Sequence, residues 1–176
     1  MSKSVLISIK PEWCELIESG KKTIEVRKTK PKLETPFKCY IYCTKGNVDS
    51  SFYCGLDGIK NGRIIGEFVC DRIHRIAIID DECVDVVDCN TSCLSSRDIL
   101  NYANGNPLYG WHISDLAIYD KPKELSEFEK PCPYDGDCWK CKFYDGGSRE
   151  ELPSCNWEDF ELTKPPQSWC YVEEAK

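Results

Sequence analysis

The stretch at residues 19–28, SGKKTIEVRK, sets a glycine, two lysines, a glutamate and an arginine at close spacing. Its second half alternates apolar and polar side chains, which is the period of a β-strand. Ile24 and Val26 then face the core, and Glu25 and Arg27 stand next to each other on the opposite face. The segment therefore predicts a strand that carries an acid and cations on one small polar surface.

The residues before this stretch predict a strand followed by a short helix. Residues 4–10, SVLISIK, alternate like a first strand, with Leu6 as the exception. Pro11 suits the first turn of a helix, and apolar residues at helical spacing follow it. Gly20 is the expected stop of this short helix, because glycine readily takes the left-handed conformation after a helix end.

The remaining pattern indicates an α+β fold with about six strands and two to three short helices. A chain of 176 residues fits one domain, so we expect 1–176 to be a single unit. A further helix is expected at 95–105, with a serine start and a glycine stop. The other strands are expected at 37–44, at 62–79 with a bend at Gly66 or near Asp71, at 110–120 and at 167–174.

The formal charge of −7 argues against a protein that coats nucleic acid through bulk electrostatics. No apolar run approaches the ~20 residues of a membrane span, and the start does not resemble a signal peptide. We therefore expect a cytoplasmic protein with no membrane partner and no evident protein partner. Residues 21–32 nevertheless concentrate six cations around one acid, Glu25, which suits either phosphate recognition or a solvated basic loop.

The chain has 13 cysteines, which is an odd and high number. Residues 121–166 differ from the rest in being rich in Pro, Asp, Glu, Gly and Cys, and they read as an insertion before the last strand. A four-thiolate structural zinc site would order this core-poor segment, and a redox dithiol or unpaired thiols are the alternatives. The expected ligands are Cys132, Cys138, Cys141 and Cys155. A second site is conceivable at Cys83, Cys89 and Cys93 in an acidic stretch that reads as a loop.

Gly20, Lys22, Glu25 and Arg27 together spell G-x-K-x-x-E-x-R, which resembles the signature of the ASCH domain in the PUA-like superfamily. The segments LISIKPEW, GRIIGEF and YGWHISDL are also similar to parts of small ASCH proteins from bacteria and their phages. The resemblance covers roughly residues 4–120 and the final strand at 167–173. It implies a PUA-like mixed β-barrel with a cleft beside the signature strand, proposed to bind RNA or a nucleoside.

Some small members of this family are amidohydrolases that remove the acetyl group of N4-acetylcytidine. The resemblance implies that Lys22 occupies the position of their catalytic lysine, which works with a threonine and a glutamate. Where those enzymes have the threonine, this sequence has Glu25. Asp85 or Asp88 lies in the region of the partner glutamate. An enzyme of this kind would have Glu25 activate water while Lys22 stabilises an oxyanion.

If the protein is a binding module, the signature residues Gly20, Lys22, Glu25 and Arg27 predict a polar pocket. Lys22 and Arg27 supply positive charge, and Glu25 can accept a hydrogen bond from an exocyclic amine. Trp111, or less directly Tyr42 or Trp13, can stack on a base, although Trp111 also suits a core position. The alternative without a binding role is an ordinary surface ion pair of Glu25 and Arg27 on a strand face.

Overall fold

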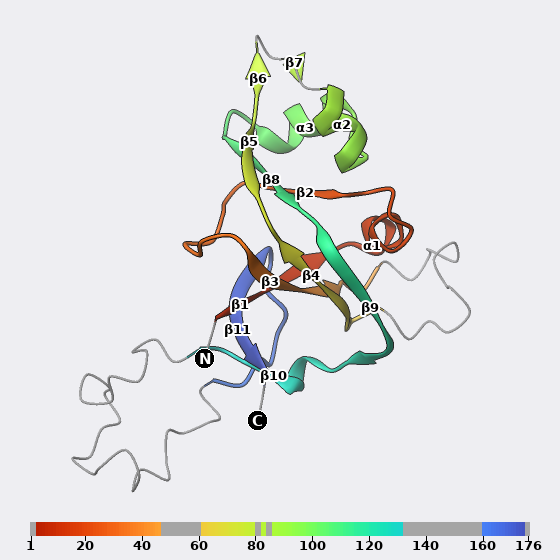
Figure 1. The fold of residues 1–176 in the computed structure, drawn as a ribbon, viewed down its shortest axis with the longest axis vertical. Coiled ribbons are helices and arrows are strands. Elements are labelled where there is room, and N and C mark those ends of the chain that lie inside the picture. The colour runs from red at the N-terminus through yellow and green to blue at the C-terminus, as the bar shows by residue number, and fades with distance from the viewer. Residues whose placement is uncertain (1–2, 47–60, 80–81, 84–85, 132–159, 175–176) are drawn as a thin grey trace, which may run out of the picture.

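Figure 1 shows the computed structural model, which describes residues 3–46, 61–79, 82–83, 86–131 and 160–174. The helices are α1 (Pro11–Glu18), α2 (Val86–Ser92) and α3 (Ser96–Ala103), with a 3-10 turn η1 (Leu125–Glu127). The strands are β1 (Ser4–Ile9), β2 (Ile24–Arg27), β3 (Phe37–Cys43), β4 (Arg63–Cys70), β5 (Ile73–Ile76), β6 (Ile78–Ile79), β7 (Glu82–Cys83), β8 (Leu108–His112), β9 (Ser114–Lys123), β10 (Phe128–Glu129) and β11 (Trp169–Glu174).

Two sheets organise most of these strands. The larger sheet has the order β10-β11-β1-β3-β4-β9, in which β1 and β3 run parallel and the other neighbours antiparallel. The smaller sheet, β2-β8-β5, is antiparallel throughout. In Figure 1 the smaller sheet lies above the larger one, with α2 and α3 at the top and α1 at the side. The expected α+β class with mixed, barrel-like sheets and short helices is confirmed.

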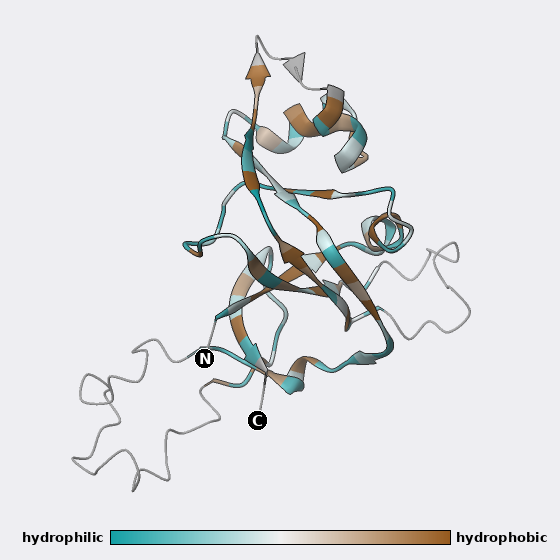
Figure 2. Cartoon of the chain, viewed as in Figure 1, coloured by the Kyte–Doolittle hydropathy of each residue, from teal (hydrophilic) through white to brown (hydrophobic). Residues whose placement is uncertain are grey.

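Strand β1 lies in the interior of the larger sheet and is buried on both faces. Its odd-numbered residues pack with α1 in one hydrophobic cluster, whereas Leu6 packs with Phe128 and Val172 in another. Leu6 breaks the simple alternation of the sequence because both faces of its strand are covered. A third cluster joins Ile24 of β2 to Ile99 of α3. Figure 2 shows the hydrophobic residues concentrated on these central strands.

Two segments expected as single strands are each divided between the sheets. Residues 62–79 form β4 in the larger sheet, leave it at Asp71, and continue as β5 in the smaller one. Gly66 accommodates the close approach of β9, because a Cβ atom there would overlap the β9 backbone. Residues 110–120 divide at Ile113 into β8 and β9. These two crossings connect the two sheets.

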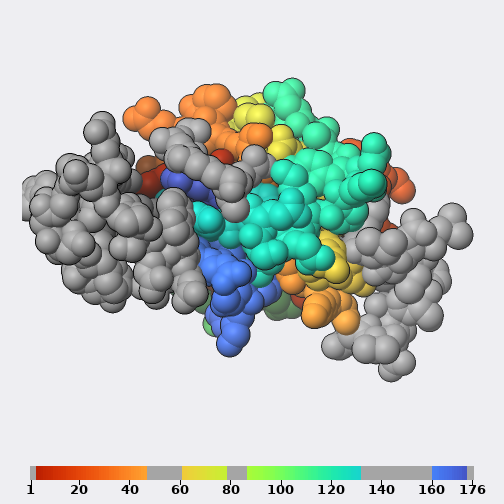
Figure 3. All heavy atoms as spheres, turned by 90° about the horizontal axis from the view of Figure 1, so that it is seen from below, coloured from red at the N-terminus to blue at the C-terminus, as the bar shows by residue number. Residues whose placement is uncertain are grey.

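The last strand, β11, returns the end of the chain to its beginning. It pairs antiparallel with β1 on one side and with β10 on the other. In the view from below, the blue atoms of residues 160–174 lie beside teal atoms, the colour of the chain segment that contains β9 and β10 (Figure 3). The strand expected at 167–174 is therefore confirmed, and it starts at Trp169.

Within the described residues, no helix is long and apolar enough to cross a membrane.

Helix α2 corrects the expectation of a loop around Cys89 and Cys93. Valine, asparagine and threonine are weak helix formers, so the local sequence carries little helical signal. The helix is held instead by tertiary contacts of Asp88 and Ser92, both of which are buried. Helix α3, in contrast, begins with the expected serine, Ser95, whose side chain and backbone form a capping box with the third helical residue.

Candidate functional site

The turn after α1 leads into β2, which carries the signature residues Glu25 and Arg27. Gly20 has a φ of 72°, which favours glycine, and a Cβ atom at this position would meet nothing within 4 Å. Its role is therefore conformational, and it does not line the cleft described below. The amide of Lys22 donates to Leu16 at 2.9 Å, and the amide of Thr23 donates to Thr91 of α2 at 2.8 Å.

Glu25 lies between two cations in the interior of the protein. Its Oε2 is 3.3 Å from Lys22 Nζ, and its Oε1 is 2.9 Å from Arg27 Nη2. Only 2% of the Lys22 side chain and 9% of the Glu25 and Arg27 side chains are exposed. The sequence placed Glu25 and Arg27 on an open polar face, whereas the structure buries all three charges as one cluster, here called the Lys–Glu–Arg cluster.

Two backbone carbonyls and one serine hydroxyl from three other segments hold this cluster in place. Lys22 Nζ donates to the carbonyl of Ser92 at the end of α2, at 2.8 Å. Arg27 Nη2 donates to the carbonyl of Ser8 in β1 at 2.6 Å, and Nη1 donates to Ser168 Oγ at 3.4 Å. The Nε–H of Arg27 is buried and has no hydrogen-bond partner among the described residues. The cluster therefore contains one buried donor that the described residues do not satisfy.

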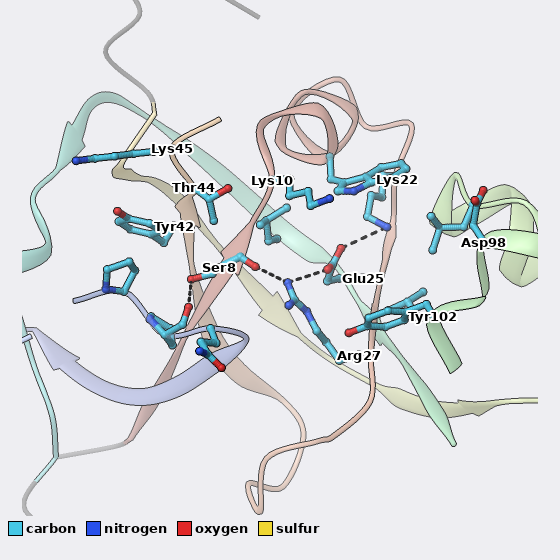
Figure 4. A pocket seen from close by; sticks show the side chains of 17 residues that line it. Ser8, Lys10, Lys22, Glu25, Arg27, Tyr42, Thr44, Lys45, Asp98 and Tyr102 are labelled. Carbon is cyan, nitrogen blue, oxygen red and sulfur yellow. Dashed lines mark hydrogen bonds and ion pairs between the residues drawn. The ribbon is translucent and has the colours of Figure 1, made fainter. Parts of the chain in front are cut away.

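The Lys–Glu–Arg cluster forms one wall of a cleft of about 810 Å³ (Figure 4). Its lining combines aromatic rings with polar and charged side chains, which is typical of sites for small polar ligands. Further lining side chains come from β1, α1, β3 and the residues directly after β1 and β3, from α3, and from the segment before β11. They are Ser8, Lys10, Trp13, Tyr42, Thr44, Lys45, Asp98, Tyr102, Pro166 and Gln167.

Trp111, expected as a stacking surface, lies in the core instead. It is opposite Glu25 in the pairing of β2 with β8, so the indole shares the face of Glu25 but lies deeper. Phe37 and Trp169 pack around it with ring centroids 6.0 and 5.8 Å away, and the exposed fraction of Trp111 is 0%. Because its ring is covered on all sides, Trp111 does not line the cleft, and the expected stacking role is wrong.

Other aromatic residues line the cleft. Trp13 of α1 and Tyr42 of β3, named above as alternatives, both belong to its wall. Tyr102 of α3 was missed, although its signal was present in the predicted helix. Ile99 and Ala103 form the buried side of α3, and Tyr102 lies off that side with 39% of its surface exposed. In Figure 4, Tyr102 and Tyr42 flank the Glu25–Arg27 pair on opposite sides.

Of the two acids considered as partners of the cluster, the one that the structure describes lies elsewhere. Asp85 falls outside the described residues, and Asp88 binds His74 Nε2 at 2.8 Å without lining the cleft. The carboxylate from this region that does line the cleft is Asp98. Hydrogen bonds from the side chain and amide of Ser95 lower the pKa of Asp98, so it is ionised at neutral pH.

Both histidines of the chain belong to a directional chain of hydrogen bonds. Arg72 can only donate, so Nδ1 of His112, 3.2 Å away, must accept. His112 Nε2 then donates to His74 Nδ1 at 3.1 Å, and His74 Nε2 donates to Asp88. This arrangement needs the imidazole of His112 to be neutral, because a proton on its Nδ1 would face the guanidinium of Arg72. It ties α2, which also holds Lys22, to β5 and β8.

We expect acid to weaken the fold through His112. Burial first, and then the charge of Arg72 and the neighbouring His74, lower the pKa of His112 from 6.5, although Asp71 and Asp88 oppose this. The folded state then binds fewer protons than the unfolded state, so stability is complete above about pH 6.5 and falls as the pH drops below it. Denaturant unfolding at pH 7.5 and 5.5 measures the loss, which should shrink in His112→Gln. Parallel losses in both proteins would contradict the role of His112.

The cysteines expected to bind zinc, Cys132, Cys138, Cys141 and Cys155, lie outside the described residues, so this site stays a prediction. Of the second group, Cys93 donates to the carbonyl of Lys21 at 3.4 Å. Cys89 Sγ lies 3.6 Å from Ser96 Oγ. Within the described part of the chain, no three histidine, cysteine or acidic side chains gather as metal ligands would.

Comparisons with known proteins agree with this architecture. The family model of the ASCH domain matches residues 7–162. The crystal structure of ASCH from Zymomonas mobilis is 20% identical over 97% of this chain and 87% of that chain, with a TM-score of 0.53. A mutant of the same Zymomonas mobilis protein is 19% identical over 98% and 91% of the two chains, with a TM-score of 0.50. No curated protein matches the chain. The fold and the family match together place this chain in the ASCH domain family.

Proposed function

We propose that the cleft binds one nucleoside unit of RNA, with its base directed at the Lys–Glu–Arg cluster. The family supports this proposal in general terms, because ASCH domains are PUA-like modules associated with RNA. The cleft supports it in particular, since its volume of about 810 Å³ lies in the range of small-molecule sites. Three buried charged side chains, Lys22, Glu25 and Arg27, are also gathered at one wall, where the edge of a base would meet them.

The observation that carries the proposal is the unpaired Nε–H of Arg27. A buried donor without a partner costs about 1–3 kcal/mol, which a ligand carbonyl or ring nitrogen would recover by accepting it. Glu25 already pairs with two cations, but each carboxylate oxygen has a second lone pair that can accept from an exocyclic amine. The cluster therefore presents a donor next to an acceptor.

Aromatic side chains complete the proposed site. Trp13, Tyr42 and Tyr102 all line the cleft, and a base stacked on one such ring gains about 1–3 kcal/mol. Tyr102 is the best placed of them, because it stands beside Arg27 and is partly exposed. The base would then meet Arg27 with its edge and a tyrosine with its face.

Arg27→Lys tests the proposal, because lysine keeps the charge but has no Nε–H and no planar fork. We expect the affinity for ribonucleosides, measured by calorimetric titration, to fall at least tenfold for the preferred base. Arg63→Lys, which makes the same change in an exposed ion pair with Glu124, should bind like the parent. Equal affinity of parent and Arg27→Lys, both shown to be folded by circular dichroism, would refute the assignment.

The amidohydrolase alternative is separated by including N4-acetylcytidine in the same series. Lys22 Nζ donates to the carbonyl of Ser92 at 2.8 Å and lies 3.3 Å from Glu25 Oε2, so its amine is already engaged by two partners. These contacts suit a binding role or an oxyanion partner better than a nucleophile. Release of cytidine by the parent, but not by Lys22→Ala, would assign the hydrolase; its absence would leave the binding proposal in place.

A further inference from the structure

Two lysine–tyrosine pairs lie directly after the signature strand. Lys28 Nζ is 5.1 Å from the ring centroid of Tyr102, and Lys30 Nζ is 5.8 Å from that of Tyr109. Both lysines are exposed, Tyr102 is 39% exposed, and Tyr109 is half-buried. A basic segment in which each cation sits over a partly accessible ring is more specific than a solvated lysine loop. We call these four residues the Lys–Tyr strip.

The strip continues from the cleft. Tyr102 belongs to both, since it also lines the cleft wall. Tyr109 is the partner of Arg27 in the pairing of β2 with β8, and Lys28 follows Arg27 in the chain. A ligand whose base meets Arg27 therefore has the strip next to it, and Lys28 and Lys30 themselves do not line the cleft.

The positive charge of the strip is not neutralised by direct ion pairs, although the carboxylate of Asp98 lies one turn before Tyr102 in α3. Glu25 is the only acid within residues 21–32, and it is already paired with Lys22 and Arg27. In the described part of the chain, no carboxylate lies within ion-pairing distance of Lys28 or Lys30. In a protein with a formal charge of −7, such a concentration is a local feature that attracts an anionic ligand to one place.

We infer that the Lys–Tyr strip holds the nucleotides that flank the one in the cleft, so that the ligand is single-stranded RNA rather than a free nucleoside. This inference rests on the proposed function. Tyrosine rings offer stacking platforms that accept any base, and the adjacent ammonium groups can contact the phosphates between those bases. A duplex keeps its bases stacked inside, so it would leave both rings without a partner.

Lys28→Ala/Lys30→Ala tests the phosphate contacts. The probe is a fluorescein-labelled eight-nucleotide RNA of mixed cytidine and uridine, and its binding is measured by anisotropy at several salt concentrations. We expect the double variant to bind at least tenfold more weakly at low salt and to lower the slope of log K against log salt by about 1.4, or 0.7 for each lost phosphate contact. Its affinity for the free nucleoside should stay within about twofold of the parent.

Lys121→Ala/Lys130→Ala is the matched control, because it removes two exposed lysines from β9 and from the residue after β10. Its RNA affinity should equal that of the parent. Tyr102→Leu should weaken RNA binding about tenfold, whereas Tyr102→Phe, which keeps the ring, should bind like the parent. This pair tests stacking separately from charge, and it does not depend on the lysine variants.

The outcomes separate this inference from the proposed function. If the parent binds nucleosides but Lys28→Ala/Lys30→Ala keeps the full RNA affinity and the salt slope of the parent, the strip is wrong and the cleft proposal stands. If neither nucleosides nor RNA bind the parent, both fall. Competition by polyglutamate as strong as that by RNA, together with unchanged binding by Tyr102→Leu, would mean an acidic peptide partner and would overturn the inference.

Discussion

Glu25→Gln should lower the free energy of unfolding by about 3–5 kcal/mol, the usual cost of removing one partner from a buried ion pair. The change keeps the shape of the side chain but deletes the only negative charge in the Lys–Glu–Arg cluster. Lys22 and Arg27, which are 2% and 9% exposed, would then face each other's charge without an acid between them. Since domains are stable by only about 5–15 kcal/mol, this loss is easily measured by urea unfolding.

Glu67→Gln is the control for this prediction. Glu67 pairs with Lys38 at 2.9 Å, but the two side chains are 26% and 44% exposed, so water screens the pair. Glu67 also accepts a hydrogen bond from the hydroxyl of Tyr119, and the amide oxygen of glutamine can accept it as well. The same chemical change should therefore cost less than about 1 kcal/mol at this site. An equal decrease in the free energy of unfolding in the two variants would mean that the burial of Glu25 does not strengthen its ion pairs.

A second substitution checks the mechanism of the loss. Adding Arg27→Met to Glu25→Gln removes one of the two unbalanced cations, so the double variant should be more stable than the sum of the single changes predicts. Strict additivity would show that the three side chains act independently. The double variant should also bind no nucleoside, because both the donor and the acceptor of the proposed site are gone.

Local signals in the sequence were enough to predict α1 and α3. Pro11 and Gly20 bound the first helix, and Ser95 begins the last one through a hydrogen bond to a residue three positions away. Each of these signals acts within one turn, so no distant residue is needed to read it. Strand β1 was likewise predicted from alternation within its segment, and the segments of β3 and β11 were also predicted as strands.

The parts that were missed depend on distant contacts. Helix α2 has weak helical propensity and is held by Asp88, which binds His74, and by Ser92, which binds Lys22. The division of 62–79 and 110–120 between two sheets depends on which strands pair, and alternation alone does not specify pairing partners. The existence of these segments was therefore predictable, whereas their assignment to a sheet was not.

The candidate site shows the same limit. Alternation predicted that Glu25 and Arg27 share a face, which the 2.9 Å ion pair between Glu25 Oε1 and Arg27 Nη2 confirms. Alternation carries no information on depth, however, and the burial of the Lys–Glu–Arg cluster comes from β1, α2 and the segment before β11. Tyr102 joins the cleft from α3, far along the chain, so only the fold brings it next to Arg27.

Trp111→Ala should be the second large effect, lowering the free energy of unfolding by about 3–5 kcal/mol as for other buried aromatic residues. The indole packs between Phe37 and Trp169, and its removal leaves a cavity that the rigid strands around it cannot close. Trp111→Phe should cost less than about 1.5 kcal/mol. It keeps an aromatic ring and removes an indole N–H that has no hydrogen-bond partner among the described residues.

Nucleoside affinity separates a core position of Trp111 from a stacking one. Because the ring of Trp111 is fully buried, Trp111→Phe should bind nucleosides as the parent does, measured by calorimetry well below the unfolding temperature. Trp13→Leu makes a comparable change in a ring that lines the cleft, and it should weaken binding with a smaller loss of stability. The reverse pattern, in which Trp111→Phe is as stable as the parent but binds tenfold more weakly, would place the base against Trp111. The cleft would then have to open between β2 and β8.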